Sequence, residues 1–215
     1  MDDHDLYAAL LHETKNHLVL LTLTLDSIPH TRQDAHDAPL DAARLLGHKV
    51  AERLMQAMLL YKAEAGALRL NAVNAYSPED MVAEMAQQAR SLAKHLEVVA
   101  RVDADVPPIW FFDRNLLQMA LMNAIHNSIS YARARIEVRA ALSDGMLALS
   151  VRDDSDGYPE HILELTAQGL PLQSNGTGLG IRFARLIAQA HRNEEREGEL
   201  RLYNDAGAVF EMRLP

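Results

Sequence analysis

The sequence predicts an α+β protein in which a helical hairpin precedes an α/β sandwich with a mixed sheet and helices on one face. Three observations support this fold class. Residues 6–28 and 40–64 have long apolar stripes at helical spacing. In the rest of the chain, short apolar runs alternate with helical segments. Some of these short runs occur in pairs, and turn-forming residues separate the two members of a pair. We therefore divide the 215 residues into two domains, 1–72 and 75–215.

The composition excludes several classes of protein. The chain has no cysteine, which excludes disulfide scaffolds, thiol catalysis and cysteine-ligated zinc. It has 30 acidic residues against 21 lysines and arginines, which argues against nucleic-acid binding. No apolar run reaches the ~20 residues of a membrane helix, and the N-terminus is acidic where a signal peptide is basic. We expect a soluble, cytoplasmic protein with no membrane segment.

The two N-terminal helices are predicted from their apolar spacing. In residues 6–28 the apolar positions alternate at spacings of four and three, and a polar, proline-bounded turn at 29–39 follows. In residues 40–64 apolar side chains recur one turn apart. Two antiparallel helices cannot bury both stripes alone, so we expect a homodimer that pairs two hairpins into a four-helix bundle.

The second domain begins with a clear helix start. Ser77 supplies a capping hydroxyl, Pro78 suits the first turn, and two acids follow near the positive end of the helix dipole. Because strands and helices are interleaved but the strand pairs look like hairpins, we expect a mixed sheet with helices on one face. The remaining elements are predicted as strands at 97–102 and 109–112, a helix at 114–131, a hairpin of 135–140 and 146–152, a helix at 179–191, and a hairpin of 199–203 and 208–214.

The first candidate site lies on the first helix. His12 and Asn16 are one turn apart, and Glu13 stands beside them. A solvent-facing imidazole next to a carboxylate suits a nucleophile whose proton the carboxylate removes. A His-Glu-x-x-His zinc site is excluded because the fourth position is Asn16. The alternative is an ordinary solvated helix surface.

The second candidate is an asparagine pair on the predicted 114–131 helix. Asn123 and Asn127 are one turn apart. Their amide oxygens suit a hard cation such as Mg²⁺ carrying phosphates. Asparagine is a mediocre helix former, so a repeated pair on one face needs an explanation. Polar surface is the alternative.

The third candidate follows the predicted strand 146–152. Asp153 could accept a hydrogen bond from a ligand, and Gly157 would let the backbone approach that ligand. The alternative is an acidic surface turn.

The fourth candidate is the segment Gly176-Thr177-Gly178-Leu179-Gly180, called the glycine box below. It opens directly into the predicted helix 179–191, where exposed amide groups and the helix dipole favour phosphate. The spacing differs from a dinucleotide Gly-x-Gly-x-x-Gly, and the Lys-Ser/Thr of a P-loop is missing. A flexible loop is the alternative, but it explains three alternating glycines before a helix poorly.

The order of these four motifs resembles the core of a sensor histidine kinase over nearly the whole chain. The resemblance identifies residues 1–72 as the dimerisation and phosphoacceptor hairpin. It identifies residues 75–215 as a Bergerat-type ATP-binding domain of the GHKL superfamily, shared with gyrase, Hsp90 and MutL proteins. It also implies that His12 accepts the phosphoryl group, that Glu13 activates His12, and that Asn16 orients water when a partner response regulator is dephosphorylated.

The resemblance implies roles for the pocket residues as well. Asn123 and Asn127 match the N box and would hold Mg²⁺ and phosphate, with Asn127 as a metal ligand. Asp153 would read the amino group of adenine, and Gly157 would shape the same pocket. The glycine box would hold the phosphates of ATP.

The function implied is an ATP-dependent protein histidine kinase. It would autophosphorylate His12 from Mg-ATP and pass the phosphoryl group to a response regulator, and it could also act as that regulator's phosphatase. The departures from the family pattern are Ser155 for a glycine, Ser130 for a basic residue, His17 for a proline, and no Gly-Gly after His191. They leave open a catalytically weak histidine phosphotransferase or scaffold. A serine kinase that inhibits a sigma factor is disfavoured by the hairpin. Because little length is left for an input domain, we expect either that a separate sensory protein controls this chain or that the chain is a fragment of a longer sensor.

Overall fold

The computed structural model describes residues 70, 73–168 and 178–215, together with residues 18, 19, 21–24, 47, 50, 54 and 61. The chain divides into two compact units, residues 1–68 and 69–215. Most of the predicted hairpin lies outside the described residues, so the hairpin and the four-helix bundle stay predictions. Within the described part of the chain, no helix is long and apolar enough to cross a membrane.

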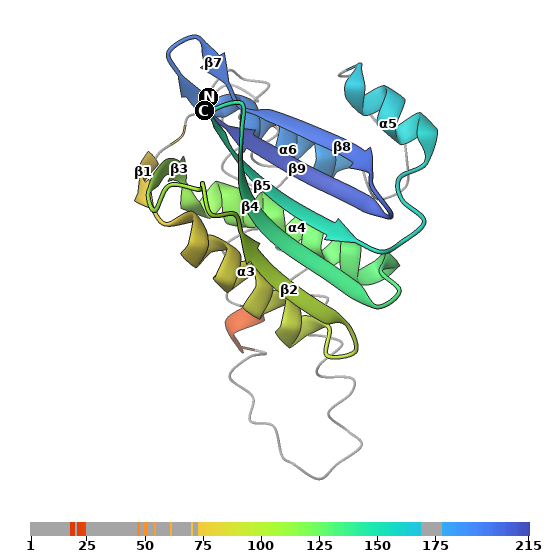
Figure 1. Ribbon diagram of the computed structural model, residues 1–215. Coiled ribbons are helices and arrows are strands. Elements are labelled where there is room, and N and C mark those ends of the chain that lie inside the picture. The colour runs from red at the N-terminus through yellow and green to blue at the C-terminus, as the bar shows by residue number, and fades with distance from the viewer. Residues whose placement is uncertain are drawn as a thin grey trace, which may run out of the picture. The chain divides into compact units, whose positions relative to one another are not determined.

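The second unit is built on a five-stranded sheet (Figure 1). Strand β2 runs parallel to β4, and every other neighbouring pair is antiparallel, so the sheet is mixed as predicted. The parallel pair requires a crossover, which passes through β3 and α4. In spatial order the strands are β2 (Glu97–Val102), β4 (Arg135–Ser143), β5 (Met146–Asp153), β9 (Ala208–Leu214) and β8 (Glu199–Asn204).

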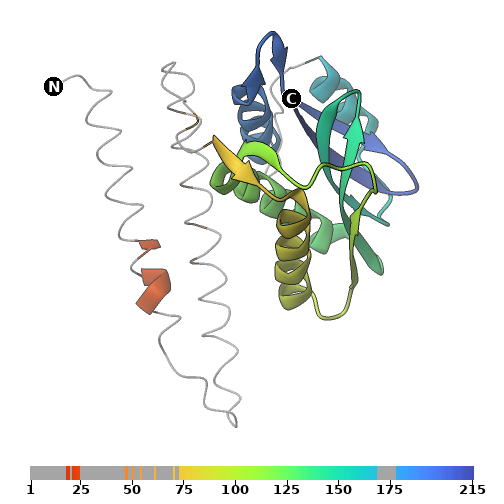
Figure 2. The same ribbon diagram turned by 60° about the vertical axis from the view of Figure 1, so that its left-hand side comes forward.

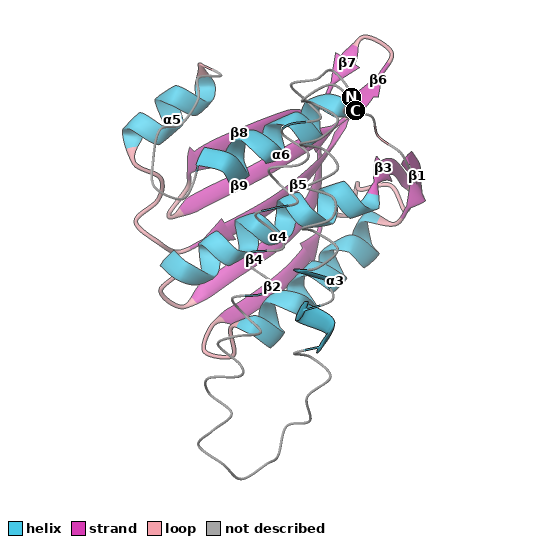
Figure 3. Cartoon of the chain, turned by 180° about the vertical axis from the view of Figure 1, so that it is seen from behind, coloured by secondary structure: helices cyan, strands magenta, loops and turns pink. Residues whose placement is uncertain are grey.

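Three helices cover one face of this sheet: α3 (Pro78–Leu92), α4 (Arg114–Tyr131) and α6 (Gly178–Ala190) (Figures 2 and 3). Every second side chain of β5 points into this layer, because side chains alternate along a strand. The predicted sandwich with helices on one face is therefore confirmed for this unit. Its largest fully buried side chains include Met81, Met85, Leu117, Leu121, Leu147, Leu149, Phe183, Ile187 and Met212.

The helix starts follow from local hydrogen bonding. The hydroxyl of Ser77 accepts from the N–H of Asp80 at 3.1 Å, and Pro78 occupies the first turn of α3. The carboxylate of Asp113 accepts from the N–H of Leu116 at 3.2 Å and caps α4. These bonds satisfy amide groups that the first turn of a helix leaves unpaired. Helix α4 begins and ends at the predicted residues.

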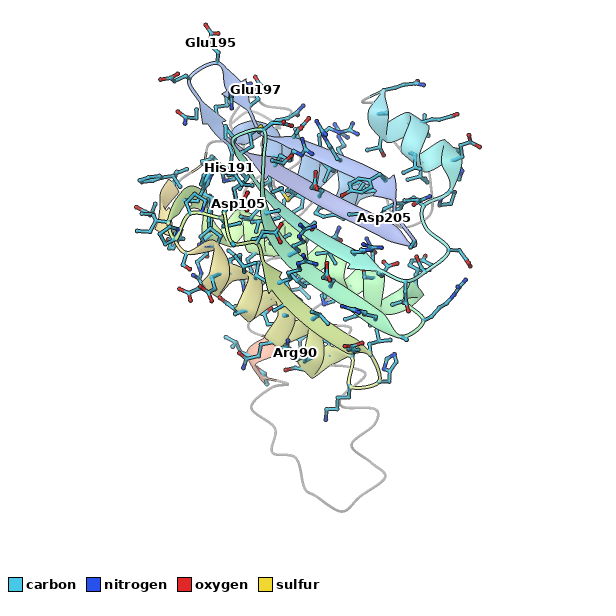
Figure 4. All side chains as sticks on the ribbon, in the orientation of Figure 1. Arg90, Asp105, His191, Glu195, Glu197 and Asp205 are labelled. Atoms are coloured by element: carbon cyan, nitrogen blue, oxygen red, sulfur yellow. The ribbon has the colours of Figure 1, made fainter. Side chains whose placement is uncertain are left out.

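Several short elements were not predicted. Strand β1 (Val73–Tyr76) was missed; it pairs as a separate ribbon with β3 (Trp110–Asp113), which is the strand predicted at 109–112. Helix α5 (Glu160–Ala167) follows β5, and β6 (Arg192–Asn193) and β7 (Arg196–Glu197) form a small hairpin. Figure 4 labels Glu195 at the tip of this projecting hairpin. Elements this short contain too few residues to produce a recognisable period.

His191 joins α4 to α6 at one end of the helix layer. Its Nε2 accepts from the N–H of Asp113 at 3.0 Å, so Nδ1 carries the proton and donates to the carbonyl of Ile187 at 2.7 Å. Burial lowers the pKa of His191, although the Ile187 carbonyl and the charge of Asp113 act in the opposite direction. The ring is 3% exposed and neutral. The N-terminal end of α4 is thereby tied to the C-terminal end of α6.

Candidate functional site

A cavity of about 370 Å³ lies where β5 ends, beside α4 and α5. Its lining includes Asn123, Asn127, Asp153 and Gly157, so four of the residues predicted from sequence meet in one place. Ile181, the residue after Gly180, also contributes to the wall. The volume falls within the range of roughly 300–1,000 Å³ that is typical of small-molecule and cofactor sites.

Asp153 faces the cavity because it continues the inward row of β5 that begins at Leu147. It is only 6% exposed. Its Oδ2 accepts from the hydroxyl of Ser128 at 2.8 Å, and its Oδ1 accepts from the N–H groups of Ser155 at 3.0 Å and Ala208 at 3.4 Å. A carboxylate has about four acceptor positions, so these three donors leave about one position for a donor on a ligand.

The asparagine pair occupies another part of the cavity wall. Asn123 is buried at 8% exposure, and a Cβ atom added at Gly180 would lie 2.2 Å from its Nδ2. The lack of a side chain at Gly180 therefore admits the Asn123 amide against the first turn of α6. Asn127, one turn along α4, is half-buried and lines the same cavity.

The chemistry of this wall suits a phosphate-bound cation. Among the described residues, no group of three or more His, Cys, Asp or Glu side chains could hold a metal ion. A cation at Asn123 and Asn127 would therefore depend on amide oxygens together with oxygens of a ligand. Mg²⁺ is commonly held in this way, through few protein ligands, substrate phosphates and water.

The segment that connects β5 to α5, residues 154–159, is called the β5–α5 loop. Gly157 has a φ of +88°, a conformation that side chains disfavour, and its N–H donates to the hydroxyl of Ser155 at 3.1 Å. Ser155 thus bonds within the turn. Asp154 accepts from the N–H groups of Arg133 at 2.8 Å and Ala134 at 3.0 Å. Desolvation raises the pKa of Asp154, but these bonds outweigh it and lower the pKa.

Other cavity residues were missed by the sequence reasoning. Ser128 directly follows Asn127, which draws attention to it, but its hydrogen bond to Asp153 depends on where β5 places that carboxylate. Tyr131 stands one turn after Asn127 and lines the cavity. Tyr158 also lines it, and both burial and the charge of Asp153 raise the pKa of its phenol, which keeps the phenol neutral.

Several predicted site residues are not tested by this geometry. His12, Glu13 and Asn16 lie outside the described residues, as do Gly176 and Thr177 of the glycine box. Gly178 and Leu179 are the first residues of α6. Their roles stay predictions.

Comparison with protein families identifies the domain that holds the cavity. Residues 112–215 match the family described as "Histidine kinase-, DNA gyrase B-, and HSP90-like ATPase". These residues are thus similar to members of that ATPase family. The match begins in β3, continues to the last residue, and includes every residue that lines the cavity. The resemblance to a histidine kinase catalytic core is thereby confirmed.

Curated relatives are signalling kinases of bacteria. The chain is 28% identical over 137 residues to the signal transduction histidine-protein kinase AtoS of Escherichia coli, an alignment that covers 60% of this chain and 21% of AtoS. It is 32% identical over 111 residues to AfsQ2 of Streptomyces coelicolor, covering 48% and 20%. With the sensor histidine kinase RppB of Synechocystis it shares 24% identity, covering 95% and 47%. The chain thus spans a fifth to about half of these relatives.

Solved structures share the fold. Full-length ShkA, crystallised in complex with AMPPNP, has a TM-score of 0.69 at 19% identity, covering 98% of this chain and 45% of ShkA. The histidine kinase AdeS of Acinetobacter baumannii has a TM-score of 0.60 at 18% identity, covering 94% and 95%.

Proposed function

We propose that this chain is a two-component histidine kinase that binds Mg-ATP in the cavity and phosphorylates His12. Residues 1–72 would form the dimerising phosphoacceptor hairpin, and residues 75–215 the ATP-binding domain. The observation that carries the proposal is the meeting of Asn123, Asn127 and Asp153 in one cavity, within the residues that match the ATPase family. The phosphoryl group would then pass to a receiver domain of a response regulator.

Asp153 supports binding of an adenine base. Its remaining acceptor position is buried and suits the exocyclic amino group of adenine, because a carboxylate accepts and the amino group donates. Guanine and hypoxanthine carry a carbonyl oxygen at that position. This oxygen and the carboxylate are both acceptors, so no proton would lie between them. Such a site discriminates strongly, since a buried polar group left unpaired is costly.

The phosphates would extend from the base toward Asn123, Asn127 and the start of α6. The contact between Gly180 and Asn123 brings the N-terminal turn of α6 to this wall. Amide groups at a helix N-terminus favour phosphate. Mg²⁺, held through Asn127 with Asn123 nearby, would neutralise charge on the phosphates. Catalysis would consist mainly of positioning and electrostatic stabilisation, as is general for phosphoryl transfer.

At His12 the step is a displacement at the γ-phosphorus of ATP. A ring nitrogen of His12 forms the new N–P bond, the bond to the bridging oxygen breaks, and ADP leaves. Glu13 removes the proton of the attacking imidazole. In the second step an aspartate carboxylate of the receiver domain attacks the phosphohistidine. Asn16 would orient the water that later hydrolyses the phosphorylated receiver.

The test is labelling with γ-phosphate-labelled ATP and Mg²⁺. The full chain should acquire acid-labile label, and His12→Ala should lose it. His17→Ala is the matched control, because the predicted helix 6–28 would turn His17 off the His12 face, and this variant should retain the label. Asp153→Asn should also reduce labelling, through weaker nucleotide binding. Folded wild-type chain that acquires no label would refute the kinase.

A second candidate is a catalytically weak histidine phosphotransferase or scaffold on the same architecture. It is favoured by Ser155, which lines the cavity where the family usually has glycine. This protein would bind an ATP analogue in a calorimetric titration yet acquire no label from ATP. It would instead accept label on His12 from a phosphorylated receiver domain.

A further inference from the structure

The turn between β8 and β9, residues 205–207, lies against the β5–α5 loop. The N–H of Ala208, just beyond the turn, donates to Asp153. A Cβ atom added at Gly207 would lie 1.8 Å from the backbone oxygen of Asp153. Figure 4 labels Asp205 in this turn, beside the chain that leads from β5 to α5. Two segments distant in sequence therefore meet where Asp153 enters the cavity.

Asn204, the last residue of β8, makes a two-point contact with the β5–α5 loop. Its Oδ1 accepts from the N–H of Tyr158 at 2.7 Å, and its Nδ2 donates to the carbonyl of Tyr158 at 3.0 Å. Both polar atoms of the side chain are thus used on the backbone of one residue. The backbone pairing of β8 with β9 ends at Asn204, opposite Ala208.

The same amide also sets the distance of the loop from β8. A Cβ atom added at Gly157 would lie 2.6 Å from Cγ and from Oδ1 of Asn204. The Asn204 amide therefore lies directly against the Gly157 backbone. Gly157 and Tyr158 both line the cavity, and the Tyr158 phenol responds to the charge of Asp153. A change in the position of the loop would alter the wall next to Asp153.

We propose that Asn204 is a positioning residue for nucleotide binding, which holds Gly157 and Tyr158 as the wall beside the adenine base. This inference rests on the proposed function. A loop held in place before binding loses less conformational freedom when the ligand enters, so affinity rises without a new ligand contact. Because Asn204 acts at the base end, its loss should weaken the binding of adenosine nucleotides, and by the same factor whatever number of phosphates they carry.

The experiment is calorimetric titration of the full chain with ADP, IDP and a non-hydrolysable ATP analogue. Asn204→Ala removes both hydrogen bonds, and Asn204→Asp keeps the size and one acceptor but removes the donor. Both variants should raise the Kd for ADP and for the ATP analogue about tenfold. The preference for ADP over IDP should fall, because the wall no longer fixes the base against Asp153. Tyr203→Phe is the matched control on β8: it removes a hydrogen bond to Glu211 and should leave every Kd unchanged.

Each remaining outcome decides against the proposal. If the wild type binds adenine nucleotides and both Asn204 variants keep its Kd values and its preference for ADP, the positioning role is wrong and the proposed function stands. If a variant binds with lower stoichiometry but unchanged Kd, Asn204 only stabilises the fold, and the positioning role is again wrong. If the wild type binds no adenine nucleotide, the proposed function fails, and this inference fails with it.

Discussion

Gly207→Ala should destabilise the second unit, residues 69–215, far more than the matched change Gly145→Ala. Both glycines have positive φ, +142° and +74°. A Cβ at Gly145 would approach only the side chain of Arg196, at 3.4 Å, which is ordinary contact. We therefore expect backbone strain alone at this position, about 1–2 kcal/mol. The comparison separates backbone strain from collision.

At Gly207 the added Cβ would lie 1.8 Å from the backbone oxygen of Asp153, and one of the two must retreat by 1.6 Å to reach ordinary contact at 3.4 Å. The obstacle is backbone within the sheet, which cannot rotate away as a side chain can. Strain and collision together should cost about 3 kcal/mol or more. Displacement of Asp153 should also weaken ADP binding.

The measurement is urea unfolding followed by fluorescence of Trp110. The chain has one tryptophan, and it lies in β3, so the signal reports the second unit. Calorimetric titration with ADP supplies the second reading. The reasoning is refuted if Gly207→Ala costs no more unfolding free energy than Gly145→Ala.

Three further predictions concern named groups of the domain. Since burial lowers the native pKa of His191, the unfolded chain binds a proton that the native state does not; the free energy of unfolding should fall as the pH drops below about 6.5. Trp110 urea titrations between pH 7.5 and 5.5 should show this slope, and His191→Gln should reduce it. Gly180→Ala should displace the Asn123 amide and weaken binding of the ATP analogue with Mg²⁺ about tenfold, measured by calorimetry. Asp153→Asn should lower the affinity for ADP more than that for IDP, because an amide nitrogen can donate to a carbonyl oxygen; an unchanged ratio in competition titrations would contradict the assigned role.

Local signals predicted the long elements well. Helix α4 runs from Arg114 to Tyr131 as predicted, because Asp113 caps it and the apolar side chains of one face recur at helical spacing. The asparagine pair and Asp153 could be recognised for a similar reason. Their chemistry depends on spacing within one helix and on position in one strand.

The contacts between distant segments could not be predicted in this way. Asn204 and Tyr158 are 46 positions apart, and nothing in either segment indicates that the amide of one meets the backbone of the other. The parallel pairing of β2 with β4 likewise depends on a crossover and not on a turn. Ser128 is intermediate: it adjoins a predicted residue, but its role depends on where β5 places Asp153.

The hydrogen bond between His191 and the Asp113 backbone links α4 and α6 at one end of the helix layer. The second contact between these helices, of Asn123 with Gly180, lies about 15 Å farther along α4, toward the other end of the layer. Two helices that are held together at one end can separate most at the opposite end. A ligand that separates these helices should therefore rotate them about the contact at His191. Removing that contact should change the affinity for a nucleotide, although His191 does not line the cavity.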